Sequence, residues 1–285
     1  MQEDNIKLMK IDAHQHFWKF DPVQDTWITN DMAVLQRDYT PSDLESLLSA
    51  HGFSGCVAVQ ADQAEAETYY LADLAKQHDW IKGVVGWVDL RSDRLQASLD
   101  QISELPSVKG FRHIIQSEPD GFMRQPAFIE GLRQLESYDF TYDILIYEQQ
   151  LEEVITLVDL LSENQKLVID HIAKPIIREK SFTTWEKYIR QLAKRPNTRI
   201  KVSGLVTEAD WQHWQQSDFQ PYLSTVLDAF GPHRMMFGSD WPVCLLAAQY
   251  EQVVSVIQDF VNPLSATEQA AIMGQTAVDF YQLSD

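Results

Sequence analysis

Apolar runs of five to nine residues, many of them β-branched, recur along the chain, and the stretches between them place apolar residues at helical spacing. The runs predict eight strands, at 11–16, 55–61, 82–90, 108–114, 141–147, 167–171, 199–205 and 235–240. The intervening stretches predict helices at 65–77, 94–105, 126–137, 149–162, 184–195, 219–230, 250–260 and 267–283. Another helix is expected to begin after Thr40, a suitable N-cap, with Pro41 in its first position and Asp43 in its first turn.

Eightfold alternation of apolar strand and helix favours an α/β fold of the closed (β/α)8, or TIM-barrel, type. An open doubly wound sheet is the alternative. It would favour a glycine-rich turn after the first strand, whereas this chain continues there into His14-Gln15-His16. Since no linker rich in Gly, Ser or Pro divides the chain, residues 1–285 are predicted to form one domain.

Residues 17–40 form a long connection after the first strand and contain Trp18, Phe20 and Trp27. Loops of this length are commonly either functional or disordered, and the aromatic content argues against disorder. We therefore expect a rim loop over the carboxyl face of the barrel.

The 285 residues include 23 Lys and Arg against 42 Asp and Glu, which gives a formal net charge of −19. This excess argues against nucleic acid and anionic membrane surfaces as partners. No run reaches the roughly 18 apolar residues of a membrane-spanning helix, and the first residues lack a signal-peptide pattern, so a cytoplasmic protein is expected. Cys56 and Cys244 are too few for a disulfide framework.

The candidate chemistry lies at the strand ends, because (β/α)8 barrels place their active sites at the carboxyl ends of the strands. His14 and His16 are two residues apart in the first strand, so their side chains face the same side. Two neutral imidazoles on one face form half of a divalent-metal site. Taken alone, however, this spacing is more typical of two hydrogen-bonded histidines without an ion.

Three further predicted strands end in ionisable side chains on the same barrel face. These residues are Arg112, His113, Asp170, His171 and Asp240. Each one alone is typical of a polar residue in the core or at the rim, but their coincidence at one face indicates an active site.

Four segments resemble the amidohydrolase superfamily and, more narrowly, its branch of sugar-lactone hydrolases, which includes the L-fucono- and L-rhamnono-lactonases. They are Asp12-Ala13-His14-Gln15-His16-Phe17-Trp18, Val168-Ile169-Asp170-His171 with Lys174-Pro175, Lys201-Val202-Ser203-Gly204-Leu205 and Phe237-Gly238-Ser239-Asp240-Trp241-Pro242. The resemblance runs from about Ile11 to Tyr281. It implies a hydrolase that opens the lactone of a sugar acid by attack of water on the ester carbonyl.

The resemblance also implies a single divalent metal ion, with Zn²⁺ favoured. The expected ligands are His14, His16, His171 and Asp240. Asp240 would be the general base. The carboxylated lysine that bridges two metals in much of the superfamily has no counterpart, since Lys109 is predicted at the wrong end of its strand. Catalysis without metal is the alternative, in which His171 or His113 polarises the carbonyl and is catalytic.

Three side chains are expected to contact the substrate, a small sugar lactone. Arg112 is placed to contact a hydroxyl or a carboxylate, although a structural ion pair fits it equally well. Trp27 and Tyr147 are expected to line the pocket, because sugars pack on aromatic faces. Lys201 is predicted toward the start of its strand and is therefore expected to be structural.

Two other functions fit the same scaffold. One is Zn²⁺-dependent, non-oxidative decarboxylation of an aromatic or unsaturated acid, and the other is sugar binding without catalysis. Lys174-Pro175 and Trp241-Pro242 favour the lactonase, while the intact histidines and Asp240 argue against a protein that only binds. The sequence identifies neither the sugar nor whether the chain forms a homo-oligomer.

Overall fold

The structure, a computed structural model, describes residues 9–284. Within this range one parallel sheet runs in the order β1 to β8, so that each strand pairs with the next one along the chain. The strands are β1 (Ile11–Gln15), β2 (Gly55–Val59), β3 (Ile81–Gly86), β4 (Val108–Ile114), β5 (Thr141–Leu145), β6 (Leu167–Ile169), β7 (Thr198–Val202) and β8 (Met235–Phe237). All eight predicted strands are thereby confirmed.

The sheet closes through backbone contacts between β1 and the segment that follows β8. The backbone N–H of Asp240 donates to the carbonyl of His14 at 2.8 Å, and that of His16 donates to the carbonyl of Trp241 at 2.7 Å. These bonds confirm the TIM-barrel prediction. They also bring Asp240 next to both histidines of β1.

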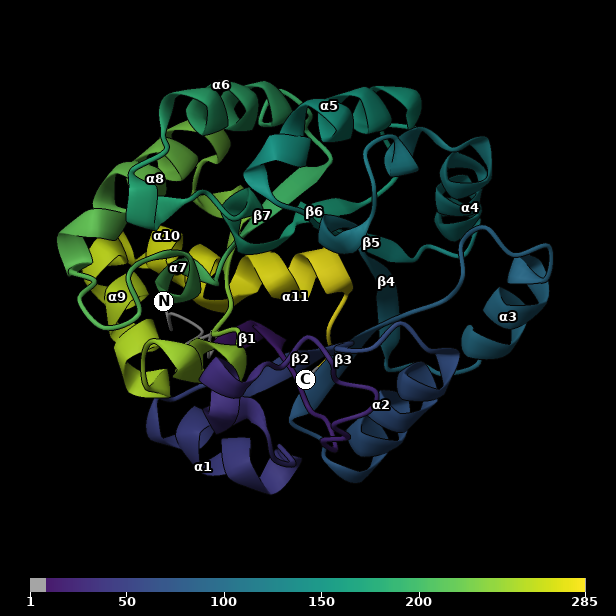
Figure 1. Cartoon of the computed structure of the whole chain (residues 1–285), viewed down its shortest axis with the longest axis horizontal. Coiled ribbons are helices and arrows are strands. Elements are labelled where there is room, and N and C mark those ends of the chain that lie inside the picture. The colour runs from purple at the N-terminus through teal and green to yellow at the C-terminus, as the bar shows by residue number, and fades with distance from the viewer. Residues whose placement is uncertain (1–8, 285) are drawn as a thin grey trace, which may run out of the picture.

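Helices surround the barrel as a ring (Figure 1). The longer ones are α1 (Pro41–Ala50), α2 (Glu65–Gln77), α3 (Leu95–Ile102), α4 (Pro126–Ser137), α5 (Leu151–Leu160), α6 (Thr183–Leu192), α8 (Gln216–Phe230) and α9 (Tyr250–Val261). The predicted start of α1 is confirmed, because Asp43 Oδ2 accepts a hydrogen bond from the backbone N–H of Thr40 at 2.9 Å. The pattern missed the short α7 (Leu205–Glu208), which begins where a strand was expected to end.

The last helical segments close the amino end of the barrel. They are α10 (Ala266–Ala270), a π-helical turn (Ala271–Gln275) and α11 (Thr276–Tyr281). Figure 1 shows α11 in yellow across the middle of the ring. Phe280 and Tyr281 of α11 pack against Ile11, Val57 and Met236 inside the barrel. The helix predicted at 267–283 is thus divided into three helical segments that cover the amino end of the barrel.

The two ends of the loop that follows β1 are joined by backbone hydrogen bonds. Trp18 and Tyr39 pair through two backbone hydrogen bonds of 3.0 and 2.9 Å, which join the two ends of the loop. Ile28 and Leu35 of this loop are buried.

Within residues 9–284, no helix combines the length and apolar character needed to cross a bilayer.

Candidate active site at the carboxyl end of the barrel

His14 and His16 project together from the end of β1, and both are buried. Their Nε2 atoms lie 3.2 Å apart. The other ring nitrogen of His16, Nδ1, lies 2.8 Å from the carbonyl oxygen of Val59 on β2. Because a carbonyl only accepts, His16 Nδ1 carries a proton and the neutral ring directs the Nε2 lone pair into the site. Burial lowers the pKa of both histidines, which favours neutral rings.

Asp240 follows β8 in a left-handed conformation, with φ of 57°, and its carboxylate turns back toward the histidines. Its Oδ1 lies 3.4 Å from His16 Nε2 and 3.8 Å from the Nε2 atoms of His14 and His171. Burial alone would raise the pKa of Asp240. The facing His171, His16 and His14 outweigh this effect and hold that pKa well below its usual range. Asp240 is therefore ionised at neutral pH.

His171 follows β6 in a turn (Asp170–Ala173) in which φ is positive from His171 through Lys174. Four such residues in succession are strained, and the surroundings must hold them in place. Trp185 Nε1 donates to the carbonyl of Ile172 at 2.7 Å, which anchors the turn to α6. Burial lowers the pKa of His171 to about 4, so its ring is neutral at neutral pH. A partly protonated His171, as the route without metal requires, is therefore not favoured.

Two glycines make room for the histidine rings. A Cβ on Gly204 would lie 2.7 Å from His171 Nδ1, and one on Gly238 would lie 2.6 Å from His14 Cβ. Gly204 also has φ of 65°, which a side chain would strain. Next to it, the Ser203 hydroxyl lies 2.9 Å from His171 Nδ1. The Ser203-Gly204 pair therefore orients His171.

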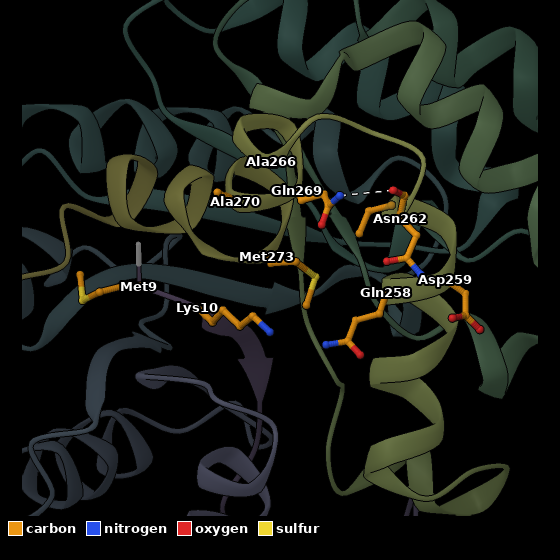
Figure 2. A pocket seen from close by; sticks show the side chains of 10 residues that line it. Met9, Lys10, Gln258, Asp259, Asn262, Ala266, Gln269, Ala270 and Met273 are labelled. Carbon is orange, nitrogen blue, oxygen red and sulfur yellow. Dashed lines mark hydrogen bonds between the residues drawn. The ribbon is translucent and has the colours of Figure 1, made fainter. Parts of the chain in front are cut away.

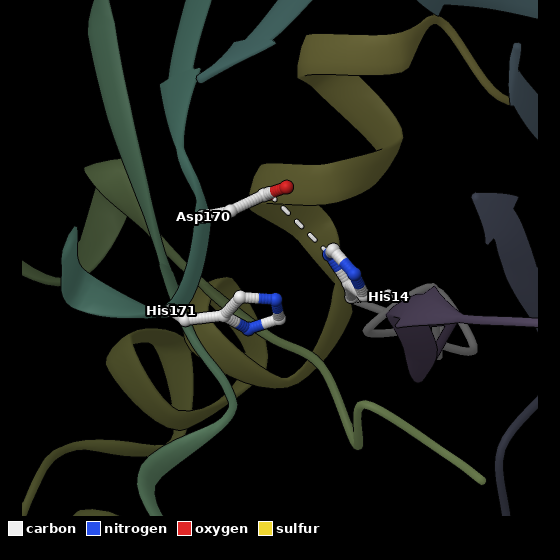
Figure 3. Close-up of side chains that lie close together, drawn as sticks. All are labelled: His14, Asp170 and His171. Carbon is white, nitrogen blue, oxygen red and sulfur yellow. Dashed lines mark ion pairs between the residues drawn. The ribbon is translucent and has the colours of Figure 1, made fainter. Parts of the chain in front are cut away.

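A network of buried charges lies below the histidines. Arg112 NH1 lies 3.1 Å from both Asp170 Oδ2 and His14 Nε2. Lys201 Nζ lies 3.0 Å from Asp170 Oδ1 and also pairs with Asp143 Oδ2 at 2.5 Å. Figure 3 shows Asp170 and His171 approaching His14 from β6. Lys201 and Arg112 balance two carboxylates, while within residues 9–284 Asp240 has only histidines for partners.

The donor set at the end of β1 suits a divalent cation. The Nε2 lone pair of His16, the Nε2 atom of His14 and the carboxylate of Asp240 converge at one point. Separations of 3.2 to 3.8 Å match the roughly 3.3 Å between ligands of a tetrahedral site with bonds of about 2.0–2.1 Å.

A second grouping of possible ligands, His14 with Asp170 and His171, is less suitable. The ammonium of Lys201 and the guanidinium of Arg112 already lie within 3.1 Å of the two oxygens of Asp170. These fixed cations repel a metal ion placed beside the same carboxylate. Arg112 lies equally close to His14 Nε2 of the first grouping, so the two groupings differ in their carboxylates. The carboxylate of Asp170 is already paired with cations, whereas that of Asp240 has no Lys or Arg partner within residues 9–284 and is the better metal ligand.

A cavity of about 230 Å³ opens above this cluster. Its polar lining comes from His16, Gln63, Arg112, Gln116, Ser117, His171, Lys174 and Asp240. Its apolar lining comes from Trp18, Trp27, Ala61, Ile114, Leu145 and Val243. Gln116 Oε1 is buried without a hydrogen-bond partner in the described part of the chain, so it is free to meet a substrate hydroxyl.

The structure brings together most of the residues singled out in the sequence, but not all. His113 needs correction, because it points out of the barrel, stacks on Phe122 and lies 2.8 Å from Glu118 Oε1 through Nε2. Tyr147 also lies outside the cavity, with 37% of its surface exposed and its ring 5.5 Å from Lys174 Nζ. Trp27 lines the cavity, and Arg112 both lines it and forms an ion pair.

Several residues of the site were not singled out in the sequence. Gln60 receives two hydrogen bonds from the Arg112 side chain on its Oε1 and so fixes the guanidinium. Gln63, Gln116 and Lys174 line the cavity from loops. Glutamines in loops carry no periodic or motif signal. Lys174 was part of the Lys174-Pro175 motif, but its position three residues after His171 was not used to place it in the pocket.

A larger hollow of about 490 Å³ lies at the other end of the barrel, beside the start of β1 (Figure 2). Its charged lining consists of Lys10 and Asp259, and no histidine lines it. Because no cluster of titratable groups lines it, this hollow is a weaker candidate for an active site than the smaller cavity.

The comparisons with known proteins agree with this geometry. The amidohydrolase family matches residues 11–283. The chain belongs to the amidohydrolase family. An L-fucono-1,5-lactonase of Burkholderia multivorans is 39% identical, with 97% of each chain covered. Another L-fucono-1,5-lactonase, from Burkholderia ambifaria, is 32% identical, with 96% of each chain covered.

A crystal structure of an amidohydrolase from Burkholderia multivorans with bound zinc superposes on this member of the family with a TM-score of 0.93. The two sequences are 39% identical, and the match covers 97% of this chain and all of the other. The fold and the hydrolase class of this amidohydrolase therefore rest on full-length similarity as well as on its own strand-end residues.

Proposed function

We propose that the protein hydrolyses a sugar lactone by attack of water on the ester carbonyl. One observation carries the proposal. The ionised carboxylate of Asp240 faces three neutral histidines at the base of a cavity that has both hydrogen-bonding and aromatic walls. The two relatives named L-fucono-1,5-lactonase, which match over nearly the full length, support the same reaction.

Asp240 is the proposed general base. It would accept a proton from the attacking water and then return it to the ring oxygen that leaves as a hydroxyl. Its carboxylate is available because no Lys or Arg of residues 9–284 pairs with it. His14, His16 and His171 surround its Oδ1 at 3.4 to 3.8 Å.

His14, His16 and Asp240 would hold a divalent metal ion, proposed to be zinc, with His171 beside them. When bound, such an ion acts as a Lewis acid toward a carbonyl or lowers the pKa of a water molecule. The bound zinc in the crystal structure of the Burkholderia relative supports this assignment.

We propose L-fucono-1,5-lactone as the first substrate to test. Trp18 and Trp27 offer aromatic surface to a sugar ring, while Gln63, Gln116 and Lys174 offer hydrogen bonds to its hydroxyls. Ile114, Leu145 and Val243 form an apolar wall suited to the methyl group of a 6-deoxy sugar. A cavity of about 230 Å³ accommodates a single six-membered lactone.

Zn²⁺-dependent decarboxylation of an aromatic acid is the alternative. Arg112 is held by Asp170 and Gln60, so Lys174 is the cation of the cavity that a substrate carboxylate would meet. A neutral lactone needs no such cation.

The test is acid release from a panel of L- and D-aldonolactones in a weakly buffered indicator solution. Each rate is corrected for spontaneous hydrolysis and measured with chelator and with added Zn²⁺. We expect enzymatic release, fastest with L-fucono-1,5-lactone. No acceleration with any lactone under either condition would refute the proposal. Release of CO2 from an aromatic acid in a parallel assay would favour the decarboxylase instead.

A further inference from the structure

Three formally charged side chains line the cavity, namely Arg112, Lys174 and Asp240. Arg112 is paired with Asp170 below the cavity. Asp240 is ionised and has no Lys or Arg partner within residues 9–284. Lys174 is the remaining charge, so the group that compensates it decides how strongly the cavity attracts an anion.

Glu208, the last residue of α7, supplies a counter-charge to Lys174. Its Oε1 lies 3.9 Å from Lys174 Nζ, and both side chains are mostly buried, with 19% and 17% of their surfaces exposed. Burial raises the pKa of Glu208, and the facing Lys174 counteracts this effect, as expected of an interacting pair. Because the pair is largely shielded from water, its charges compensate one another more effectively than those of an exposed pair.

The separation of the two groups leaves the N–H groups of Lys174 available. A distance of 3.9 Å exceeds the length of a hydrogen bond, so Glu208 offers its charge without taking a donor. An ammonium in this state can donate to the hydroxyl groups of a neutral sugar. A carboxylate ligand, in contrast, would have to compete with Glu208 for the same positive charge.

This difference matters because hydrolysis of a lactone changes the charge of the ligand. A neutral lactone enters the cavity, and a sugar acid that is ionised at neutral pH must leave it. The new carboxylate forms in the cavity that also contains the carboxylate of Asp240, and the two like charges repel each other. Without a counter-charge, Lys174 would oppose this repulsion and retain the acid.

We propose that Glu208 is a specificity-determining residue that makes the cavity favour neutral sugar lactones over sugar acids. By compensating the charge of Lys174, it weakens the binding of the acid and leaves the binding of the lactone nearly unchanged. Its part in product release rests on the proposed lactonase function, but the preference for a neutral over an anionic sugar is measurable without turnover.

The test compares two ligands that differ in charge at one carbon atom. L-Fuconate is the open acid of L-fucono-1,5-lactone, and L-fucitol has the same chain with a hydroxymethyl group in place of the carboxylate. Isothermal titration calorimetry measures both affinities for the unmodified protein, Glu208→Gln and Glu208→Gln/Lys174→Gln, all at the same metal content. Glu179→Gln is the matched control, because it removes the same formal charge from an exposed position five residues after Lys174. Circular dichroism and thermal unfolding establish that each variant folds.

We expect Glu208→Gln to bind L-fuconate about 5- to 20-fold more tightly than the unmodified protein does, because Lys174 loses its counter-charge. The affinity for L-fucitol should stay within about twofold. Glu179→Gln should resemble the unmodified protein, and the added Lys174→Gln should abolish the gain. In lactone hydrolysis, Glu208→Gln should be inhibited more strongly by added L-fuconate, while its kcat/KM for the neutral lactone stays within about threefold.

A folded Glu208→Gln variant that binds L-fuconate no more tightly than the unmodified protein would overturn the proposal. A gain that persists without Lys174 would also overturn it, because Glu208 would then act through another group. If Glu208→Gln does not fold, Glu208→Met takes its place, and failure of both to fold would reject the proposal in favour of a structural role. Absence of lactone hydrolysis by the unmodified protein would instead reject the lactonase, while the two affinities would still decide the role of Glu208.

Discussion

Single side chains decide the chemistry of this barrel, and Asp240 is the one whose loss should cost most. Its carboxylate is the ionised group that faces all three histidines, so Asp240→Asn removes the proposed base while keeping nearly the same shape. We expect kcat for lactone hydrolysis to fall about 10²- to 10⁴-fold. The thermal midpoint should change little, because an amide still fits between the rings. Initial rates of acid release and thermal unfolding check both expectations.

His113→Gln is the control for Asp240→Asn. His113 lies near the same end of the barrel, but its ring packs on Phe122 and Phe128 outside the cavity. We therefore expect an unchanged kcat and a lower thermal midpoint. Near-normal turnover in Asp240→Asn, or a large loss of turnover in His113→Gln, would contradict the assignment of roles.

The histidines and Asp240 were predictable from sequence because they combine a strand end with a motif. The outward position of His113 was predictable in principle too, since consecutive residues of a strand face opposite sides and Arg112 faces inward. Lys201 was harder to place. The sequence predicted it toward the start of a strand at 199–205, but β7 ends at Val202, so Lys201 lies next to the carboxyl end and its Nζ reaches His14 and Asp170.

At the scale of elements, the sequence predicted strands that are longer at their carboxyl ends, where the site lies, than the strands of the structure. The predicted strands ran two or three residues past β2, β6 and β8, into short segments such as Asp170-His171 that leave the sheet and carry side chains of the site. The strained turn that carries His171 is an example. Its conformation depends on contacts with α6 and β7 that are distant in sequence, and no local pattern specifies them.

The segment after β7 gives a prediction for Gly204. Gly204→Ala would add a Cβ within 3 Å of the His171 ring at a residue with φ of 65°. We expect a backbone cost of about 1–2 kcal/mol and, in addition, a displaced ring and a clear fall in kcat. Thermal unfolding and lactone hydrolysis measure the two effects separately.

Gly231→Ala is the matched control for Gly204→Ala. Gly231 has φ of 71°, but an added Cβ would have no neighbour within 4 Å. This variant should lose more stability than Gly204→Ala, because its ψ of 161° is essentially restricted to glycine, and yet it should keep its kcat. Equal activities of the two alanine variants would show that room for His171 is not what Gly204 provides.

At the scale of the whole molecule, the net charge is −19, and several of the carboxyl groups are buried. Burial changes the pKa of such groups, so the stability of the fold depends on pH. Glu67 on α2 accepts hydrogen bonds from the backbone N–H groups of Ala61 and Asp62, next to the cavity. Burial raises its pKa from 4.5 to about 7. The folded protein therefore binds a proton that the unfolded chain has released between these two pH values.

This difference fixes the sign of the pH dependence. A raised carboxyl pKa contributes stability below pH 4.5, and that contribution is lost as the pH rises toward 7. We expect the free energy of unfolding to fall over this interval. The binding of one additional proton to the folded state would give a slope of roughly 1.4 kcal/mol per pH unit. The expected slope is a fraction of this value, because Glu67 is only partly buried. Glu67→Gln should flatten this slope. Glu130→Gln removes the same formal charge from an exposed site on α4 and should leave the slope unchanged. Urea unfolding of the three proteins at half-unit steps from pH 4.5 to 7.5 makes the comparison, and parallel slopes for all three would show that Glu67 does not take up the proton.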